Sequence, residues 1–227
     1  MSNCLVRLGE SRFNAGSLRH LLFGSLIALA VPASAVATNA DKPGTKEQVT
    51  ARYAVAGIAS GMTSSQVAVA ASNAGYQLVH ETKGDDWAEA LRSAMGAKFE
   101  FGRPKNGIRD QEYRRGGERI SVNYLPMPGG SIATLIGYSA PVAVLSYEQA
   151  DAELSRRYGP KSFGNRAGAP WSIWCAKQAK DARDCLNYAR ITLEKGIDGV
   201  PIYTDDPALK AEQVRLFRQH SGAKASF

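Results

Sequence analysis

The chain has 227 residues, which is enough for one domain of medium size or for two small ones. Hydrophobic residues make up 44% of the chain and charged residues 22%, so the composition is that of a globular protein and excludes a disordered or collagen-like chain. The formal net charge of +7 favours anionic partners electrostatically but carries no information about the fold.

Residues 1–37 have the layout of a secretory signal peptide. Three arginines precede an apolar run at 21–31, and Pro32 and small residues with two overlapping A-x-A sites follow it. We therefore predict cleavage between Ala35 and Thr38 and a periplasmic or secreted mature protein. An uncleaved membrane anchor is the alternative, but a spanning helix needs about 20 apolar residues and only the first half of 21–40 is strongly apolar. A lipoprotein is not expected, because no cysteine follows the apolar run.

The mature chain is predicted to alternate between helices and strands. Residues 38–47 are interpreted as a linker, and a weak helix is predicted over 48–59. Clearer helices are predicted where a capping residue precedes an apolar stripe, at 63–75, 86–95, 146–158 and 206–219. Strands are predicted at 76–82, 98–103, 119–125, 131–145, 171–176, 185–194 and 200–203. No second apolar run is long enough to cross a membrane, so the mature chain is expected to have no stable span.

These elements predict an α+β fold, in which helices pack on one face of an antiparallel sheet. The helix starts at 63–67 and 146–150 have similar capping boxes, and each helix is followed by strands. We therefore expect a first α+β unit over 48–140 and a second over 141–227. The two units are either related halves or parts of one continuous domain. The identities between them are few, so a true duplication is left open.

The first of these helix starts carries Gly61, Met62, Thr63, Gln66 and Val67. This pattern resembles the G-M-T-x-x-Q-V helix start of the SmpA/OmlA type, the small lipoprotein of the outer-membrane barrel-assembly machinery. A tandem of such units is also similar to the secreted β-lactamase inhibitor proteins. The resemblance covers residues 48–110 and implies a helix followed by an antiparallel sheet. The chain departs from the lipoprotein pattern because it has no lipidation cysteine.

Cleavage after the signal peptide would leave two cysteines, Cys175 and Cys185, and a net charge of +5. An even number of cysteines in an exported chain predicts a disulfide. We expect the two residues to face each other directly across a hairpin centred on Lys180. Only His80 and His220 remain as histidines, and neither belongs to a metal-binding pattern, so no metal or other cofactor is expected.

Two groups of side chains are candidates for binding a partner. Arg109, Arg114 and Arg115 lie in the basic segment 98–119 and suit lipid head groups, lipopolysaccharide or an acidic protein. Acidic residues interleave with them, so a solvated hairpin is the alternative. Nucleic acid is not expected, because no ladder of aromatic side chains accompanies the arginines. Trp171 and Trp174 are predicted on opposite faces of one strand, which leaves one of them available to anchor a partner.

The sequence gives no positive sign of catalysis. Hydrolase, zinc-protease, P-loop and dinucleotide-binding motifs do not occur in a suitable strand–helix context. The acidic pairs at 85–86 and 205–206 lie at predicted helix starts, where carboxylates cap free N–H groups. We therefore expect a non-catalytic envelope protein that binds a protein or an anionic surface. A secreted enzyme inhibitor is the second hypothesis, and an enzyme with an unrecognised carboxylate- or tyrosine-based site is the third.

Overall fold

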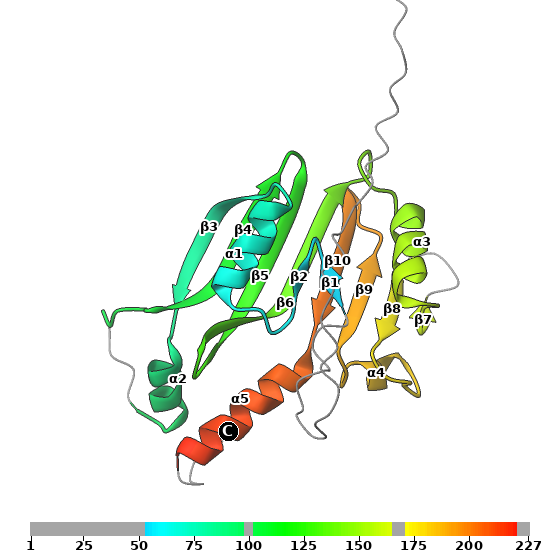
Figure 1. The fold of residues 1–227 in the computed structure, drawn as a ribbon. Helices are drawn as coiled ribbons and strands as arrows, with labels where there is room; N and C mark the ends of the chain where they lie inside the picture. The colour runs from blue at the N-terminus through cyan, green and yellow to red at the C-terminus, as the bar shows by residue number, and fades with distance from the viewer. Residues whose placement is uncertain (1–52, 98–101, 165–170, 222–227) are drawn as a thin grey trace, which may run out of the picture. The chain divides into compact units, whose positions relative to one another are not determined.

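A large antiparallel sheet occupies the centre of the computed structural model, which describes residues 53–97, 102–164 and 171–221 (Figure 1). Its strands are β3 (Gln77–Gly84), β4 (Gly107–Arg115), β5 (Glu118–Met127), β6 (Gly130–Pro141), β7 (Phe163–Gly164), β8 (Trp171–Cys175), β9 (Arg190–Glu194) and β10 (Gly199–Asp205). They lie in the order β3-β4-β5-β6-β10-β9-β8-β7, and all neighbours are antiparallel. A small separate sheet pairs β1 (Ala54–Val55) with β2 (Ile58–Ala59). The predicted α+β fold with an antiparallel sheet is confirmed.

The helices begin where the local sequence supplies a cap. They are α1 (Ser64–Asn73), α2 (Trp87–Ala94), α3 (Tyr147–Tyr158), α4 (Ala182–Cys185) and α5 (Pro207–His220). Thr63, Asp86 and Ser146 each form a complete capping box with the residue three positions on. The longest described helix has 14 residues, and none in the described part of the chain has the length and hydropathy that a bilayer span requires.

The two halves of the sheet are similar in part. In each half one helix precedes four strands, α1 before β3 to β6 and α3 before β7 to β10. A second helix interrupts the strands at different points, α2 between β3 and β4 and α4 between β8 and β9. The last strands of the two halves, β6 and β10, pair with each other from Pro141 with Gly199 to Leu135 with Asp205. The eight strands therefore form one continuous sheet.

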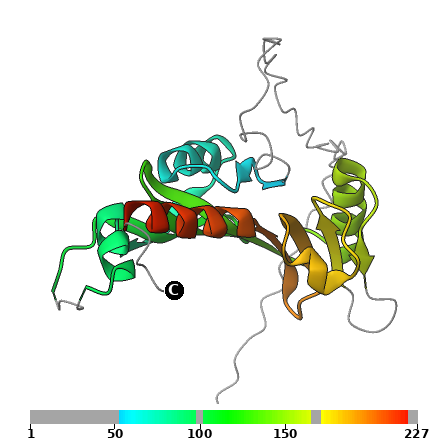
Figure 2. The same cartoon turned by 90° about the horizontal axis from the view of Figure 1, so that it is seen from below.

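One face of this sheet is buried beneath α1, α3 and the small β1–β2 sheet. Ile120 and Val122 of β5 and Ile191 and Leu193 of β9 are fully buried there, and Leu154 of α3 packs in the same cluster. Figure 2 shows α1 and the β1–β2 sheet on the same side of the large sheet. The alternation of apolar and polar residues along the strands therefore sets which face forms the core.

Helices α2 and α5 lie against each other at the end of the sheet where β5 turns into β6. The rings of Trp87 and Phe217 stack with their centroids 4.8 Å apart. Gln213 Nε2 donates a hydrogen bond to the carbonyl oxygen of Pro126, near the end of β5, over 2.8 Å. These contacts hold α5 against α2 and the end of β5, although α5 comes after the last described strand in the sequence.

The weak helix predicted over 48–59 is wrong in its described part. Residues 54–59 form the two short strands β1 and β2, and Ala56 and Gly57 between them have φ angles of 51° and 81°. Two successive residues with positive φ angles form the two-residue loop of a β-hairpin, and this backbone conformation is incompatible with an α-helix. Tyr53, Val55 and Ile58 are buried in the core, so this segment packs its apolar side chains as a hairpin and not as a helix.

The strand prediction also missed β4. Of the strand predicted at 98–103, Phe99 and Phe101 lie outside the described residues, and Arg103 is in no strand. The strand that follows β3 in the sheet is Gly107–Arg115, which has a mostly charged sequence. Its Gln111 and Tyr113 are buried against the core, whereas Glu112 and Arg114 lie on the opposite face. A strand of this kind has too few apolar residues for their alternation to be visible.

Two other predicted strands are too long. The strand predicted at 131–145 ends at Pro141, because the carbonyl of Pro141 accepts hydrogen bonds from the backbone of Val144 and Leu145 in a turn. The strand predicted at 185–194 begins only at Arg190, since Cys185 ends the short helix α4.

Asp206, the N-cap of α5, is a buried carboxylate with one unpaired oxygen. Only 3% of the residue is exposed, and its Oδ1 accepts a hydrogen bond from Ala208 N over 3.1 Å. Its Oδ2 has no hydrogen-bond partner in the described part of the chain. Burial raises the pKa of this carboxyl above its usual value, and the charge of Asp205 adds to the effect. Folding therefore favours the protonated form of Asp206.

Because the folded-state pKa of Asp206 is raised, its contribution to stability is lost as the pH rises from the unfolded-state pKa through the folded-state pKa. Asp206→Asn retains an oxygen that caps α5 and removes the charge. We expect it to raise the free energy of unfolding at pH 7, because a neutral amide costs less to bury than a carboxylate, and by less at pH 3, where the carboxyl is protonated more often. Urea denaturation at both values measures this. An equal effect at the two pH values would contradict the assignment.

Candidate interaction surface

We call the sheet face opposite α1 and α3 the open face. The register of the strands aligns its side chains in rows across the sheet. The central row consists of His80, Glu112, Ser121, Gly137, Tyr203, Thr192, Ile173 and Phe163, one from each strand. The row is polar toward β3, and toward β7 it is aromatic or apolar except for Thr192. Residues from both halves of the chain therefore share one surface.

The polar part of the open face is held by ion pairs. The carboxylate of Glu112 lies 2.7 Å from Arg114 Nε and 2.8 Å from an Arg119 guanidinium nitrogen. On the neighbouring strand β3, the Thr82 hydroxyl donates a hydrogen bond to the carboxylate of Asp110 on β4 over 2.7 Å. Exposed pairs of this kind add little to stability, so their main effect is to fix charged groups on the surface.

The middle of the open face is formed by a tyrosine ring over a glycine. A Cβ atom on Gly137 would lie 2.7 Å from Ser121 Oγ and 3.4 Å from Cδ1 of Tyr203. Glycine therefore lets the Tyr203 ring lie close to the neighbouring strand. Tyr203 is still 39% exposed. A fixed aromatic ring with a polar hydroxyl is a type of side chain that is enriched in protein interfaces.

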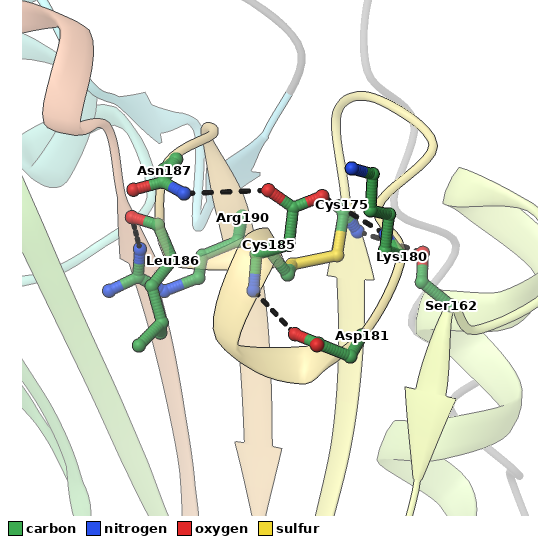
Figure 3. Close-up of a disulfide and its surroundings, with 9 residues drawn as sticks. Ser162, Cys175, Lys180, Asp181, Cys185, Leu186, Asn187 and Arg190 are labelled. Carbon is green, nitrogen blue, oxygen red and sulfur yellow. Dashed lines mark hydrogen bonds between the residues drawn. A yellow bond between two sulfur atoms is a disulfide. The ribbon is translucent and has the colours of Figure 1, made fainter.

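A disulfide lies on the open face at the end of β8 (Figure 3). It joins Cys175 at the end of β8 to Cys185 at the end of α4, with their Cα atoms 5.8 Å apart. The two cysteines form a small apolar cluster with Ile173, and Phe163, Trp171 and Ala179 pack against it. The loop that carries α4 is thereby held beside the sheet.

The predicted disulfide partners are confirmed, but the predicted hairpin register is wrong. Cys175 stands opposite Arg190 in the β8–β9 pair, and not opposite Cys185. The segment between the strands contains a helical turn, which begins at Asp181, where the carboxylate accepts a hydrogen bond from Asp184 N over 2.7 Å. Because Asp181 caps a helical turn, this segment does not form the simple hairpin that the spacing of the two cysteines predicted.

Arg109 and Arg114, two of the three candidate arginines, lie toward opposite ends of β4, and each has an acidic partner. Arg109 Nε lies 2.9 Å from Asp110 Oδ2, and its hydrogen bond lowers the pKa of the Asp110 carboxyl. Arg114 pairs with Glu112 on the open face. The structure therefore does not gather these charges into one basic patch.

Arg115, the third candidate, is bound to neighbouring elements. Its guanidinium lies 4.5 Å from the ring centroid of Tyr76, and it donates hydrogen bonds to Ala74 O and Glu118 over 2.7 Å each. The Tyr76 hydroxyl also donates to Glu118, and burial raises the pKa of Tyr76 well above its usual value. Arg115 thus connects the end of α1 to the β4–β5 turn.

These placements predict different effects for two arginine variants. Arg115→Ala removes a hydrogen bond to a helix-terminal carbonyl and a cation–π contact, so we expect it to lower the free energy of unfolding by about 1 kcal/mol. Arg109→Ala removes only an exposed ion pair and should change this free energy by less than about 0.5 kcal/mol. Urea denaturation measures both, and equal losses would contradict the structural role of Arg115.

The two candidate tryptophans lie on opposite faces of β8. Trp174 is 1% exposed on the covered face, and its Nε1 donates a hydrogen bond to Gly159 O over 3.0 Å. Trp171 lies on the open face, half-buried against the cluster around the disulfide. Trp174 is therefore a core residue and is not accessible to a partner, whereas Trp171 is partly accessible.

A polar cluster beneath α3 was not predicted. The Ser172 hydroxyl donates to Asp151 Oδ1 over 2.6 Å, and it lies 2.8 Å from the Tyr147 hydroxyl and 3.2 Å from Lys161 Nζ. Lys161 Nζ also lies 3.1 Å from both carboxylate oxygens of Asp151. No spacing in the sequence signals this cluster, because its members lie on a helix, a strand and a connecting segment.

A serine beside a lysine and an aspartate has the residue types of a nucleophile with a base. However, Ser172 is fully buried, with 0% of the residue exposed. Its single proton is donated to Asp151, and its lone pairs face Lys161 and Tyr147. Such a hydroxyl has no free approach for a substrate, so the cluster attaches α3 to β8.

No three His, Cys, Asp or Glu side chains within the described ranges converge as they would to hold a metal ion. Family models, curated proteins and solved structures give no match to this chain.

Proposed function

We propose that the chain is an exported, non-catalytic protein that binds another protein through the open face. The observation that carries this proposal is the row of side chains that crosses all eight strands on that face. The row contains the charged Glu112, which is paired with Arg119 from a neighbouring row, and the exposed aromatic ring of Tyr203. Interfaces between proteins are enriched in aromatic side chains and arginine, and their rims are polar.

Export is supported by two independent features of the chain. Residues 1–37 have the charge and apolar layout of a signal peptide. Cys175 and Cys185 form a disulfide, and disulfides persist mainly in oxidising compartments such as the periplasm. An anionic surface is less favoured as the partner, because Arg109, Arg114 and Arg115 all have acidic partners.

Enzyme inhibition is the second candidate function, and it would use the same surface. It is supported by the helix that precedes four strands in each half of the chain, although α2 and α4 interrupt these strands at different points, and by the union of the eight strands in one sheet. A tandem of units of the kind that the 61–67 helix start indicates is similar to the secreted β-lactamase inhibitor proteins. Under the inhibitor hypothesis, the protein that binds to the open face is an enzyme.

Lysine substitutions on the two sides of the sheet test the proposal. Tyr203→Lys changes an exposed residue of the open face, and Val69→Lys changes a residue on α1 that is 61% exposed. We expect Tyr203→Lys to weaken capture of the partner from envelope extract about tenfold or more, the scale of a lost interface anchor. Val69→Lys should leave capture unchanged. Equal capture by both variants and the wild type would exclude the open face.

A further inference from the structure

Three exposed aliphatic side chains lie together at one end of the sheet. Val142 and Val144, in the connection from β6 to α3, are 51% and 56% exposed, and Ile197, in the turn from β9 to β10, is 99% exposed. We call Val142, Val144 and Ile197 the turn patch. The two turns are neighbours, because Pro141 at the end of β6 pairs with Gly199 at the start of β10. Figure 1 shows both turns at the same end of the sheet.

The backbone holds these side chains in solvent. Gly196 N donates a hydrogen bond to Gly199 O over 3.0 Å and closes a two-residue loop with Ile197 at its tip. In the other turn, Val144 N donates to Pro141 O over 2.8 Å. A fixed apolar tip loses little conformational freedom when it enters a partner, so it is suited to binding.

The residues that flank the turn patch in the sequence are mostly acidic. Glu148, Glu194 and Asp198 are exposed there, with one basic residue, Lys195. In the adjoining β4–β5 turn, where Gly117 lies against Pro141, Arg115 is paired with Glu118. Lys195 lies near Glu148, since its charge helps to lower the pKa of that carboxyl, after hydrogen bonds from the Glu148 backbone and from Ser146. The whole chain has a net charge of +7, so this excess of acid is local.

We propose that the turn patch is a second docking surface, separate from the open face, and that its occupant is a protein with an apolar pocket bordered by lysine or arginine. The aliphatic tips offer no hydrogen bonds, so they require an apolar cavity. The acidic border requires positive charge around that cavity. The same carboxylates would be repelled by the anionic head groups of a membrane surface.

Photo-crosslinking tests this surface in the full chain. A benzophenone amino acid is placed at position 197, and at position 69 as the control, in cells that produce the protein. We expect position 197 to give an adduct with a partner protein and position 69 to give none. Mass spectrometry should identify the crosslinked residue of the partner, and lysine or arginine should surround that residue on the partner's surface. An adduct with lipid, an adduct with a second copy of the chain, or no adduct would overturn the proposal.

Binding of the purified partner then separates the turn patch from the open face. Ile197→Asp and Asp198→Lys should each weaken binding at least tenfold, and Asp198→Lys should also reduce its salt dependence. Tyr203→Lys should leave this binding unchanged, so failure of the open-face proposal is distinguishable from failure of this one. Co-sedimentation with phosphatidylglycerol vesicles should be absent. Unchanged affinity of the Asp198→Lys variant for the partner would contradict the proposed role of the acidic border in binding.

Discussion

Trp174→Ala should lower the free energy of unfolding by about 3–5 kcal/mol, the largest effect that we expect from a single substitution in the described core. The side chain is 1% exposed and packs in the main core cluster, so its removal leaves a cavity. It also leaves Gly159 O without the hydrogen bond from the indole Nε1. This carbonyl follows α3, so the loss should loosen that helix on β8.

Urea denaturation of Trp174→Ala and Trp171→Ala compares the two faces of β8. Trp171 is half-buried in the small cluster around the disulfide, so its replacement should cost less than half as much. If Trp174→Ala does not fold, Trp174→Phe retains part of the apolar volume and should still lose more stability than Trp171→Phe. The reverse order would contradict the burial of Trp174.

Removal of the disulfide should have the next largest effect. The double variant Cys175→Ala/Cys185→Ala opens a loop with a sequence separation of 10, for which the chain-entropy model gives about 2–3 kcal/mol. Both residues also pack in the cluster with Ile173, and alanine fills less of that space. Urea denaturation of the variant and of the oxidised wild type measures the loss.

Reduction of the wild-type protein provides the matched control. Cys185 is 0% exposed and Cys175 is 8% exposed, so a thiol reductant reaches the bond only when the loop opens. We expect slow reduction of the native protein and fast reduction in urea. Fast reduction of the native protein would show that the loop does not shield the bond.

The features that were predictable from the sequence are those set by neighbouring residues. Thr63 with Gln66 and Ser146 with Gln149 define helix starts within four residues, and the structure has both. The face assignment of β5 also follows from alternation, since Ile120, Val122 and Tyr124 are buried. Local patterns therefore located most helices and the clearest strand.

The features that were missed depend on contacts between distant segments. β4 is a strand because β3 and β5 pair with it on both sides, and its Gln111 is buried because two tyrosine hydroxyls and Glu81 surround its amide. The Ser172 cluster and the separation of Arg109 from Arg115 likewise come from the packing of the sheet. Residue types alone do not specify such contacts.

The pairing of β6 with β10 also determines the order in which this chain can fold. Among the strands that the structure describes, β6 is the longest, with 12 residues, and its second partner, β10, is the last of them to be synthesised. Until β10 is available, β6 is an unprotected edge that can pair with other chains. Contacts between such distant segments form slowly. Nascent chains that end before 199 should therefore depend on chaperones to avoid aggregation.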